Sequence, residues 1–202
     1  MQRAIVVTTA VILAVMVAAP AMAGPPAHRT GFYIGLGMGL GMATWDWADP
    51  SQFGSAPSEW AGTANFHLGG ALRENLVLGA EFQGWAKKWR VERSTGEQLG
   101  DVTVQMGSLT FAATWWPGNV GYYLRGGIGI GRARMELDDG NVTVKPAADT
   151  GLALLGAMGY EWRITDRFAL GPQLEVVYLG VDGDIFGNAT VLDGSIQFNW
   201  YW

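Results

Sequence analysis

Hydrophobic and polar residues alternate one by one along most of the chain. The clearest run is the last, in which Ile196, Phe198, Trp200 and Trp202 alternate with Ser195, Gln197, Asn199 and Tyr201. Because successive side chains of a strand point to opposite faces, a period of two predicts a strand with one apolar face. That face is large enough to lie against lipid.

About eight segments of this kind follow one another, each roughly 10 to 14 residues long. They cover about Gly31 to Thr44, Glu59 to Leu72, Leu76 to Trp85, Val102 to Trp115, Tyr122 to Gly131, Gly151 to Trp162, Phe168 to Tyr178, and the C-terminal strand. In the fourth, the apolar residues change parity between Met106 and Leu109. We predict a β-bulge near Gly107 and Ser108 as the reason.

Short and long connections alternate between these segments. Tight turns are predicted at 73–75, 116–119 and 165–167, and longer connections at about 45–58, 87–100, 135–149 and 181–188. Outer-membrane barrels have short periplasmic turns and longer extracellular loops. The chain is therefore predicted to be all-β, a closed antiparallel transmembrane β-barrel of about eight strands with both termini on the periplasmic side.

The N-terminus predicts export. Arg3 precedes an apolar run from Ala4 to Ala19, which Pro20 and the small-residue triplet 21–23 follow. This order is typical of a secretory signal peptide. We expect residues 1–23 to be a cleaved signal peptide and residues 24–202 to form one barrel domain.

Composition is consistent with an exported barrel. The 202 residues include 30 Gly, 10 Trp and no Cys, and the formal net charge is -5. An exported protein without cysteine has no disulfides, so its stability must come from packing or from a closed hydrogen-bonded sheet. The mild acidity argues against nucleic acid as a partner.

Several motifs resemble those of a known family. They are Gly31 to Gly37 after the signal peptide, Leu76 to Phe82, Tyr123 to Gly127 and the aromatic C-terminus. They look like the small eight-stranded outer-membrane barrels that include the OmpA transmembrane domain, OmpX and the opacity-type porins. The resemblance implies an outer-membrane location in a Gram-negative cell envelope. It specifies architecture more than activity, because members of this family share a fold and differ in role.

The predicted inner faces carry a set of polar and charged residues. This candidate lumen network consists of His67, Glu81, Gln83, Arg125, Glu161, Gln173 and Glu175. An eight-stranded barrel is just wide enough for side chains to fill it, and buried charges must pair. We therefore predict a lumen plugged by side chains. The alternative is a narrow porin-like channel, which requires these charged side chains to separate from one another.

Two sets of apolar residues have predicted roles at the membrane. The resemblance implies that Ile196, Phe198, Trp200 and Trp202 are a sorting signal for the barrel assembly machinery. Aromatic rings favour the headgroup level of a bilayer. The predicted lipid-interface aromatics at the periplasmic side are Phe32, Trp115, Tyr122, Tyr160, Trp162 and Phe168, with Trp200 and Trp202.

Catalytic and metal-binding patterns are weak. Outer-membrane lipid A deacylases carry a His-x-Ser pair, whereas His67 is followed by Leu68 and Gly69, and His28 by Arg29 and Thr30. Asp182, Asp184 and Asp193 are spaced like part of a calcium loop, but Phe186 stands where an oxygen ligand is needed. We predict no catalytic residue, no metal and no cofactor, and keep a lipid-modifying enzyme as a second alternative.

Aromatic and basic residues gather near the first two long connections. They are Trp45, Trp47, Phe53 and Trp60 near the first, and Trp85, Trp89, Lys87, Lys88, Arg90 and Arg93 near the second. They are candidates to contact lipopolysaccharide phosphates or an extracellular ligand. The alternative is an upper aromatic girdle with snorkelling cations, which Arg132 and Arg134 also fit.

These patterns predict a structural, membrane-stabilising or ligand-contacting protein of the outer membrane, and not an enzyme. Its expected partners are outer-membrane lipid and lipopolysaccharide, the assembly machinery during biogenesis, and an extracellular ligand at the loops. A soluble exported barrel of the lipocalin type is a third alternative. The glycine-rich inner faces and the C-terminal Trp202 argue against it.

Deletion of Trp202 tests the predicted assembly signal. We expect the shortened chain to insert poorly, because the last residue of the signal is lost while the loops are untouched. The measurement is the amount of protein in isolated outer membranes, with deletion of a single residue at a loop as the control. Normal insertion without Trp202 would contradict the prediction.

Overall fold

The computed structural model describes residues 29–49, 51, 57–92, 98–119, 121–138, 143–144, 148–181, 183 and 185–202. The predicted signal peptide, its predicted cleavage before Gly24, and His28 lie outside these residues. Eight long strands make up most of the described chain. They are β1 (Phe32–Trp47), β2 (Ser58–Arg73), β3 (Leu76–Glu92), β4 (Gln98–Trp115), β5 (Tyr122–Asp138), β7 (Asp149–Tyr160), β9 (Phe168–Val181) and β10 (Phe186–Tyr201).

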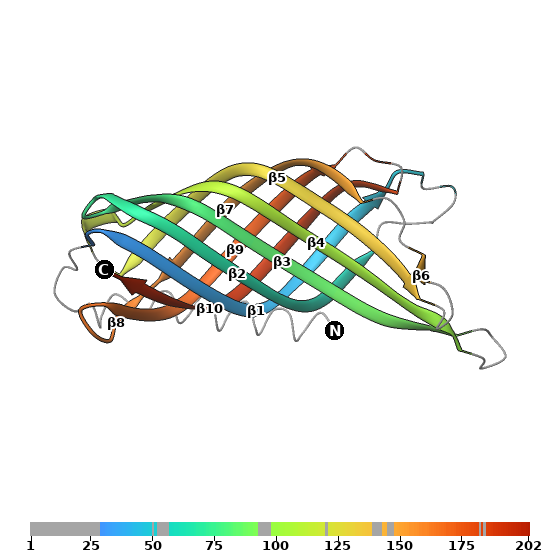
Figure 1. Cartoon of the computed structure of the whole chain (residues 1–202), viewed down its shortest axis with the longest axis horizontal. Helices are drawn as coiled ribbons and strands as arrows, with labels where there is room; N and C mark the ends of the chain where they lie inside the picture. The colour runs from blue at the N-terminus through green and yellow to red at the C-terminus, as the bar shows by residue number, and fades with distance from the viewer. Residues whose placement is uncertain are drawn as a thin grey trace.

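The long strands form one closed antiparallel barrel, which confirms the predicted fold (Figure 1). Each pairs with the next along the chain, and β10 pairs with β1 from Tyr33 opposite Tyr201 to Trp47 opposite Phe186. Two short strands add to this: β6 (Thr143–Val144) pairs with β5, and β8 (Trp162–Arg163) pairs with β9 beyond the end of β7. Closure leaves no unpaired edge along the body of the barrel.

The register around the barrel sets the strand tilt and the width. The row of paired residues that starts at Tyr33 passes through Gly69, Gly79, Ala112, Gly127, Leu155, Val177 and Val191 and returns to β1 at Ala43, ten residues further on. A closed eight-stranded sheet with such a stagger has strands tilted by roughly 35–45°. Its interior is just wide enough for the inward side chains to fill.

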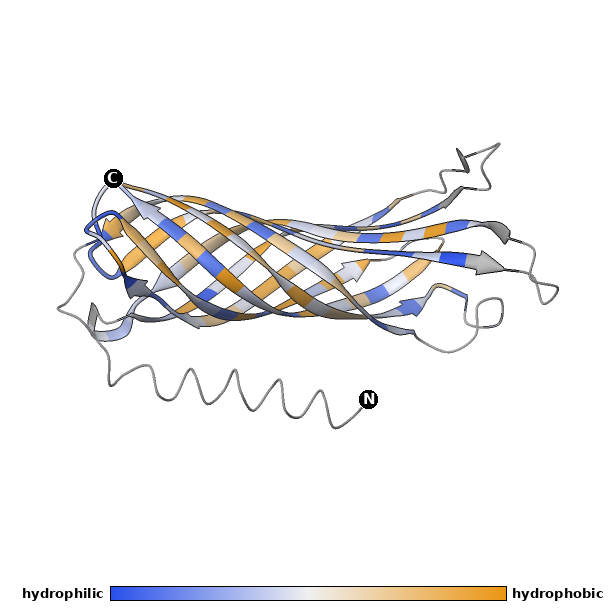
Figure 2. Ribbon diagram, turned by 90° about the horizontal axis from the view of Figure 1, so that it is seen from below, coloured by the Kyte–Doolittle hydropathy of each residue, from blue (hydrophilic) through white to orange (hydrophobic). Residues whose placement is uncertain are grey.

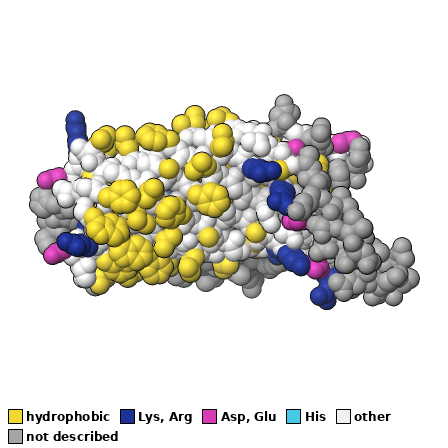
Figure 3. All heavy atoms as spheres, viewed as in Figure 1, with side chains coloured by type: hydrophobic (Ala, Val, Ile, Leu, Met, Phe, Trp, Pro, Cys, Tyr) yellow, Lys and Arg dark blue, Asp and Glu magenta, His cyan; other side chains and the backbone are white. Residues whose placement is uncertain are grey.

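The outer face is apolar over much of the barrel. Side chains such as Met38, Leu40, Phe111 and Ile130 are exposed by 60–66%. Apolar and polar residues alternate along the ribbons (Figure 2), and the apolar side chains gather into a broad belt (Figure 3). A contiguous apolar surface of this extent marks a membrane or protein interface, and in a closed barrel with a period of two it indicates a transmembrane belt.

Short turns and long connections lie at opposite ends (Figure 1). The turn end contains residues 74–75, the short 3-10 helix Pro117–Asn119 and residues 164–167, together with Trp202. Gly118 has a φ of 69°, a left-handed conformation that favours glycine in this tight turn. Among the described residues, no helix has the length and apolar character needed to cross a bilayer.

The predicted bulge near Gly107 and Ser108 is wrong. The pairing of β3 with β4 runs without a shift from Leu76 opposite Trp115 to Val91 opposite Gly100. Val104 and Met106 therefore face inward with Ser108, and their exposures are 0% and 2%. The parity of apolar residues changes because the lumen itself changes from polar to apolar, and the backbone stays regular.

The strands also extend further than predicted at the loop end. The connection predicted at 87–100 is largely a hairpin, since β3 reaches Glu92 and β4 starts at Gln98. Similarly, β1 continues to Trp47 and β5 to Asp138. The outward side chains of these extensions are mostly polar or charged, whereas inward ones such as Trp47 and Trp89 pack against a buried apolar cluster.

Glycines allow close approach of neighbouring strands inside the barrel. A Cβ atom at Gly129 of β5 would lie 2.6 Å from the Thr110 Cα of β4, whereas a Cβ at Gly126, on the outer face of the same strand, would meet nothing nearer than 4.0 Å. Neither glycine has a positive φ. The two positions therefore differ in available space.

Gly129→Ala should destabilise the barrel by about 1–3 kcal/mol, because a methyl group is forced against the backbone of β4. The matched variant Gly126→Ala should fall within about 0.5 kcal/mol of the parent. Urea unfolding of the refolded protein in lipid vesicles measures both. Equal effects of the two substitutions would show that the close approach does not limit stability.

Candidate functional site in the barrel lumen

The lumen is polar toward the turn end and apolar toward the loop end. All seven residues of the predicted lumen network are buried, with exposures of 5% or less. Asn199 and Tyr201, on the polar face predicted for the last strand, join them, and the structure adds Arg29, Tyr33 and Asp193. Beyond this polar half lies a cluster of buried apolar side chains.

Arg125 of β5 is the centre of the polar half. Its Nη1 donates to Glu81 Oε2 at 3.3 Å and to Gln173 Oε1 at 3.1 Å, and its Nη2 donates to Tyr33 OH at 3.2 Å. Its Nε donates to Thr114 Oγ1 at 2.8 Å. One guanidinium thus ties together side chains from β1, β3, β4 and β9, so that it crosses the lumen and fixes its neighbours.

His67 lies beside this guanidinium. Its Nδ1 is 3.1 Å from Glu81 Oε2, and its Nε2 is 3.1 Å from Gln197 Oε1. Glu81 therefore faces both His67 and Arg125. Because the ring is held by a carboxylate on one side and an amide on the other, His67 acts as a bridge between β3 and β10.

Glu175 and Asp193 are buried beyond Arg125. They lie opposite each other on β9 and β10. Gln173 Nε2 donates to Glu175 Oε2 at 2.7 Å, and Thr63 Oγ1 donates to Asp193 Oδ1 at 2.6 Å. Asp193 shares the inward parity of Ser195 and Gln197, and this parity could have identified it from the sequence.

Gln83 is also buried, and neither polar atom of its side chain has a partner among the described residues. It lies opposite Asn65 and Ser108 on the two neighbouring strands. The sequence placed Gln83 in the network, but the structure does not join it to the hydrogen bonds around Arg125.

A second ion pair closes the turn end. Arg29, just before β1, pairs with Glu161, and its guanidinium carbon lies 4.1 Å from the centre of the Trp116 ring. Glu161 also accepts hydrogen bonds from Tyr201 OH at 2.6 Å and from Asn199 Nδ2 at 3.3 Å. Glu161 does not contact Arg125 directly, but Asn199 accepts a hydrogen bond from Tyr33 OH at 3.0 Å and so links Glu161 to the Arg125 cluster. The alternation of apolar and polar residues could not place Arg29 in the lumen, because Arg29 precedes the first strand.

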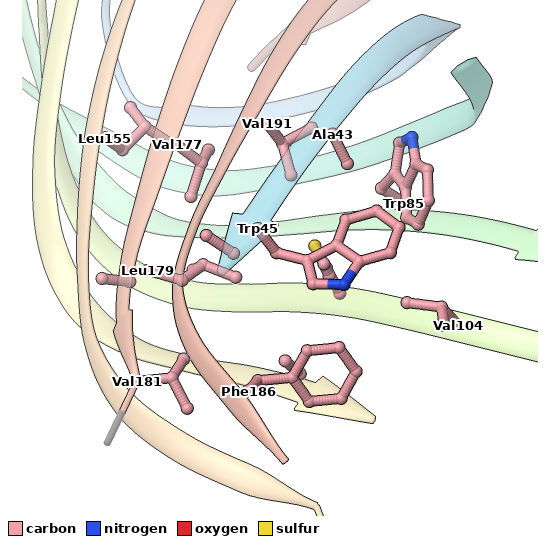
Figure 4. Close-up of a cluster of buried hydrophobic side chains, with 14 residues drawn as sticks. Ala43, Trp45, Trp85, Val104, Leu155, Val177, Leu179, Val181, Phe186 and Val191 are labelled. Carbon is pink, nitrogen blue, oxygen red and sulfur yellow. The ribbon is translucent and has the colours of Figure 1, made fainter. Parts of the chain in front are cut away.

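The apolar half contains fourteen buried side chains (Figure 4), of which Trp45, Trp85 and Phe186 carry the largest rings. The rings of Trp45 and Trp85 are 6.0 Å apart, and those of Trp45 and Phe186 are 6.5 Å apart. Trp85 Nε1 donates to the Gly41 carbonyl at 3.1 Å. This half of the lumen is filled by packed aromatic and aliphatic groups.

Trp45 and Trp85 therefore do not belong to the outer aromatic rim considered from the sequence. Both are 2% exposed and lie inside the barrel. Trp47 and Trp89 are partly buried against the same cluster, and Trp60 remains outside with 39% exposure. Phe53, Arg93, Asp182 and Asp184 lie outside the described residues.

The predicted interface aromatics lie near the turn end of the strands. Phe32 and Trp115 are about half exposed, and the Phe32 ring lies 6.3 Å from that of Trp202. Tyr160 differs from them, because its exposure is only 4% and its ring packs at 5.5 Å against Trp162. Ile196, Phe198, Trp200 and Trp202 share the outer parity of the closing strand β10.

Little free space remains in the polar half. A cavity lined by Tyr33, His67, Val77, Glu81 and Arg125 has a volume of about 10 Å³, which is room for about one water molecule. Within the described ranges, no three His, Asp or Glu side chains converge so as to hold a metal ion. His67 contacts Glu81, Arg125 and Gln197, and it has no serine partner there.

Solved structures similar to this chain include small outer-membrane barrels. No family model and no curated protein matches the sequence. Ail, the attachment invasion locus protein of Yersinia pestis, in complex with the heparin analogue sucrose octasulfate, shares 12% identity at a TM-score of 0.59 over 84% of this chain and 99% of its own. Neisserial surface protein A shares 14% identity at a TM-score of 0.57 over 86% and 99%. OprG of Pseudomonas aeruginosa shares 12% identity at a TM-score of 0.50 over 89% of this chain and 100% of its own.

At these identities the likeness concerns the fold. Together with the apolar belt and the closed register, it defines the class: the chain is a small, closed eight-stranded β-barrel of the outer-membrane kind, located in the outer membrane.

Arg125→Met should destabilise the barrel by about 3–5 kcal/mol, because it leaves Glu81 buried without its cation. The double variant Arg125→Met/Glu81→Gln should recover part of this loss, since the uncompensated charge is removed. Arg167→Met, at an exposed turn, is the control and should change stability by about 0.5 kcal/mol or less. Urea unfolding in vesicles measures all three. A double variant no more stable than Arg125→Met would contradict the pairing.

Proposed function

We propose that this protein is a closed, non-enzymatic barrel that stabilises the outer membrane and contacts ligands from its outer surface. The observation that carries this proposal is the filling of the lumen in two successive layers. Arg125 and its partners occupy the turn-end half, and the cluster around Trp45 and Trp85 occupies the loop-end half. A protein with a filled interior can meet other molecules only at its surface.

The filled lumen argues against the narrow channel. A polar path past Arg125 requires its contacts to Glu81, Gln173 and Tyr33 to break together. A continuous path also requires the rings of Trp45, Trp85 and Phe186 to move aside. Ions lose their hydration beside such an apolar layer, and its side chains offer no replacement hydrogen bonds. This half of the lumen therefore opposes conduction even if the polar half opens.

The lipid-modifying enzyme is also disfavoured. Such chemistry needs a nucleophile and a base near the lipid-facing surface. The described histidine, His67, is 3% exposed, and Glu81, Arg125 and Gln197 surround it inside the lumen. It therefore has no access to a lipid substrate.

The partners that fit this role meet the outside of the barrel. They are the surrounding lipid and lipopolysaccharide, the assembly machinery that would read Ile196, Phe198, Trp200 and Trp202, and an extracellular ligand at the loop end. The bound state of Ail, with a sulfated heparin analogue, supports an anionic ligand for a barrel of this shape.

Planar-bilayer recordings test the filled lumen. The refolded mature protein should show a heat-dependent shift in gel mobility and no discrete current steps. The variant Arg125→Ala/Trp85→Ala shortens one large side chain in each half, and it should give steps if it keeps the mobility shift. Steps from the parent protein would instead favour the narrow channel.

A further inference from the structure

The outer face of the barrel carries a group of cations just above the apolar belt. It consists of Lys88 and Arg90 on β3 and Arg132 and Arg134 on β5, which we call the cationic rim. All four side chains have the outward parity of their strands. Figure 3 shows Lys and Arg side chains gathered beyond the loop-end edge of the apolar belt on this side of the molecule.

The pairing of β3, β4 and β5 places the rim directly above lipid-facing residues. The outermost apolar row is Phe82, Leu109 and Ile130, which lie opposite one another and are 51–60% exposed. The next row toward the loops is Gly84, Gly107 and Arg132. Because Gly84 and Gly107 have no side chains, the outer surface next to Arg132 is recessed. The apolar belt ends at this row.

The strand tilt brings cations of different rows to similar heights. Each step from β3 to β5 along a row moves toward the loop end, as the stagger from Tyr33 to Ala43 shows. On β3, Lys88 lies four residues closer to the loop end than Gly84, which is in the row of Arg132. Lys88 therefore lies near the height of Arg132 on β5. Cations at this level face the headgroup layer and not the membrane core.

The spacing of the rim suits a ligand with several anionic groups. From the strand rise and the strand spacing, the Cα atoms of Arg132 and Arg134 lie about 7 Å apart, and those of Lys88 and Arg132 about 16 Å apart. The first pair can hold one phosphate between two guanidinium groups. By the same geometry the Cα atoms of Lys88 and Arg134 lie about 12 Å apart, so Lys88 can reach the same phosphate or a neighbouring one.

The charge balance of this sector also favours an anion. Asp101 lies 2.8 Å from Lys88, and Glu136 lies 3.2 Å from Arg134. Among the described residues, Arg132 and Arg90 have no ion pair. Asp138 lies opposite Asp101, so the outward positions of these rows hold four cations and three carboxylates, a formal charge of +1, whereas the whole chain has a net charge of -5.

We propose that the cationic rim is a binding site for the phosphates of lipopolysaccharide, with Arg132 and Arg134 holding one phosphate and Lys88 approaching another. This inference rests on the proposed membrane-stabilising role and names its lipid partner and its sector of the barrel. The occupant is a lipid because the site is continuous with the apolar belt. It carries more than one phosphate because the cations of the rim extend over about 16 Å of the surface.

Fluorescence anisotropy of labelled lipopolysaccharide tests the site, with the full mature protein in zwitterionic micelles. Arg132→Gln/Arg134→Gln should weaken binding about 30-fold, as the loss of two surface cations implies. The control Arg73→Gln/Arg167→Gln removes the same charge from the exposed turn end and should bind like the parent. Every variant is compared only if it retains the heat-dependent gel shift.

Equal affinity of the rim variant and the parent, or an equal loss in the control pair, would overturn the proposal. Dephosphorylated lipopolysaccharide and the singly charged phosphatidylglycerol should both bind more weakly than lipopolysaccharide, and equal binding of either would also overturn it. Current recordings on the same preparations test the filled lumen separately. A conducting barrel that still needs Arg132 and Arg134 would refute the proposed plug and leave the rim site intact.

Discussion

Closure of β10 onto β1 is the constraint on which the rest of the structure depends. In a bilayer, backbone groups have no water to bind, so a sheet is stable there only when every strand is paired on both sides. Once the sheet closes with eight strands and the observed stagger, the width of the lumen is set. The inward side chains must then fill that volume and satisfy one another's charges.

The two halves of the lumen meet this requirement differently. Arg125 gathers Glu81, Gln173 and Tyr33 into hydrogen bonds, and Arg29 joins Glu161 at the turn end. The loop-end half instead packs Trp45, Trp85 and neighbouring aliphatic groups. Because the inside is filled, contacts with other molecules are left to the exterior, where the apolar belt gives way to cations.

Much of the fold could be predicted from alternation alone, because a strand sends every second side chain to the same face. The alternation placed Glu81, Arg125 and Glu175 inside. It failed where an inward side chain is itself apolar, at Val104 and Met106. There the residues that face the lumen are as apolar as those that face lipid, so the pattern suggested a bulge that the register does not contain.

The sequence by itself determined the strand count, the apolar exterior and the assignment of most residues to the inside or the outside, since each of these depends on neighbours along one strand. Only the tertiary structure decided which inward residues meet. Arg29 and Glu161 are 132 residues apart, and Thr63 and Asp193 are 130 apart. Such pairs depend on the stagger at which the sheet closes, and that stagger is a property of all eight strands together.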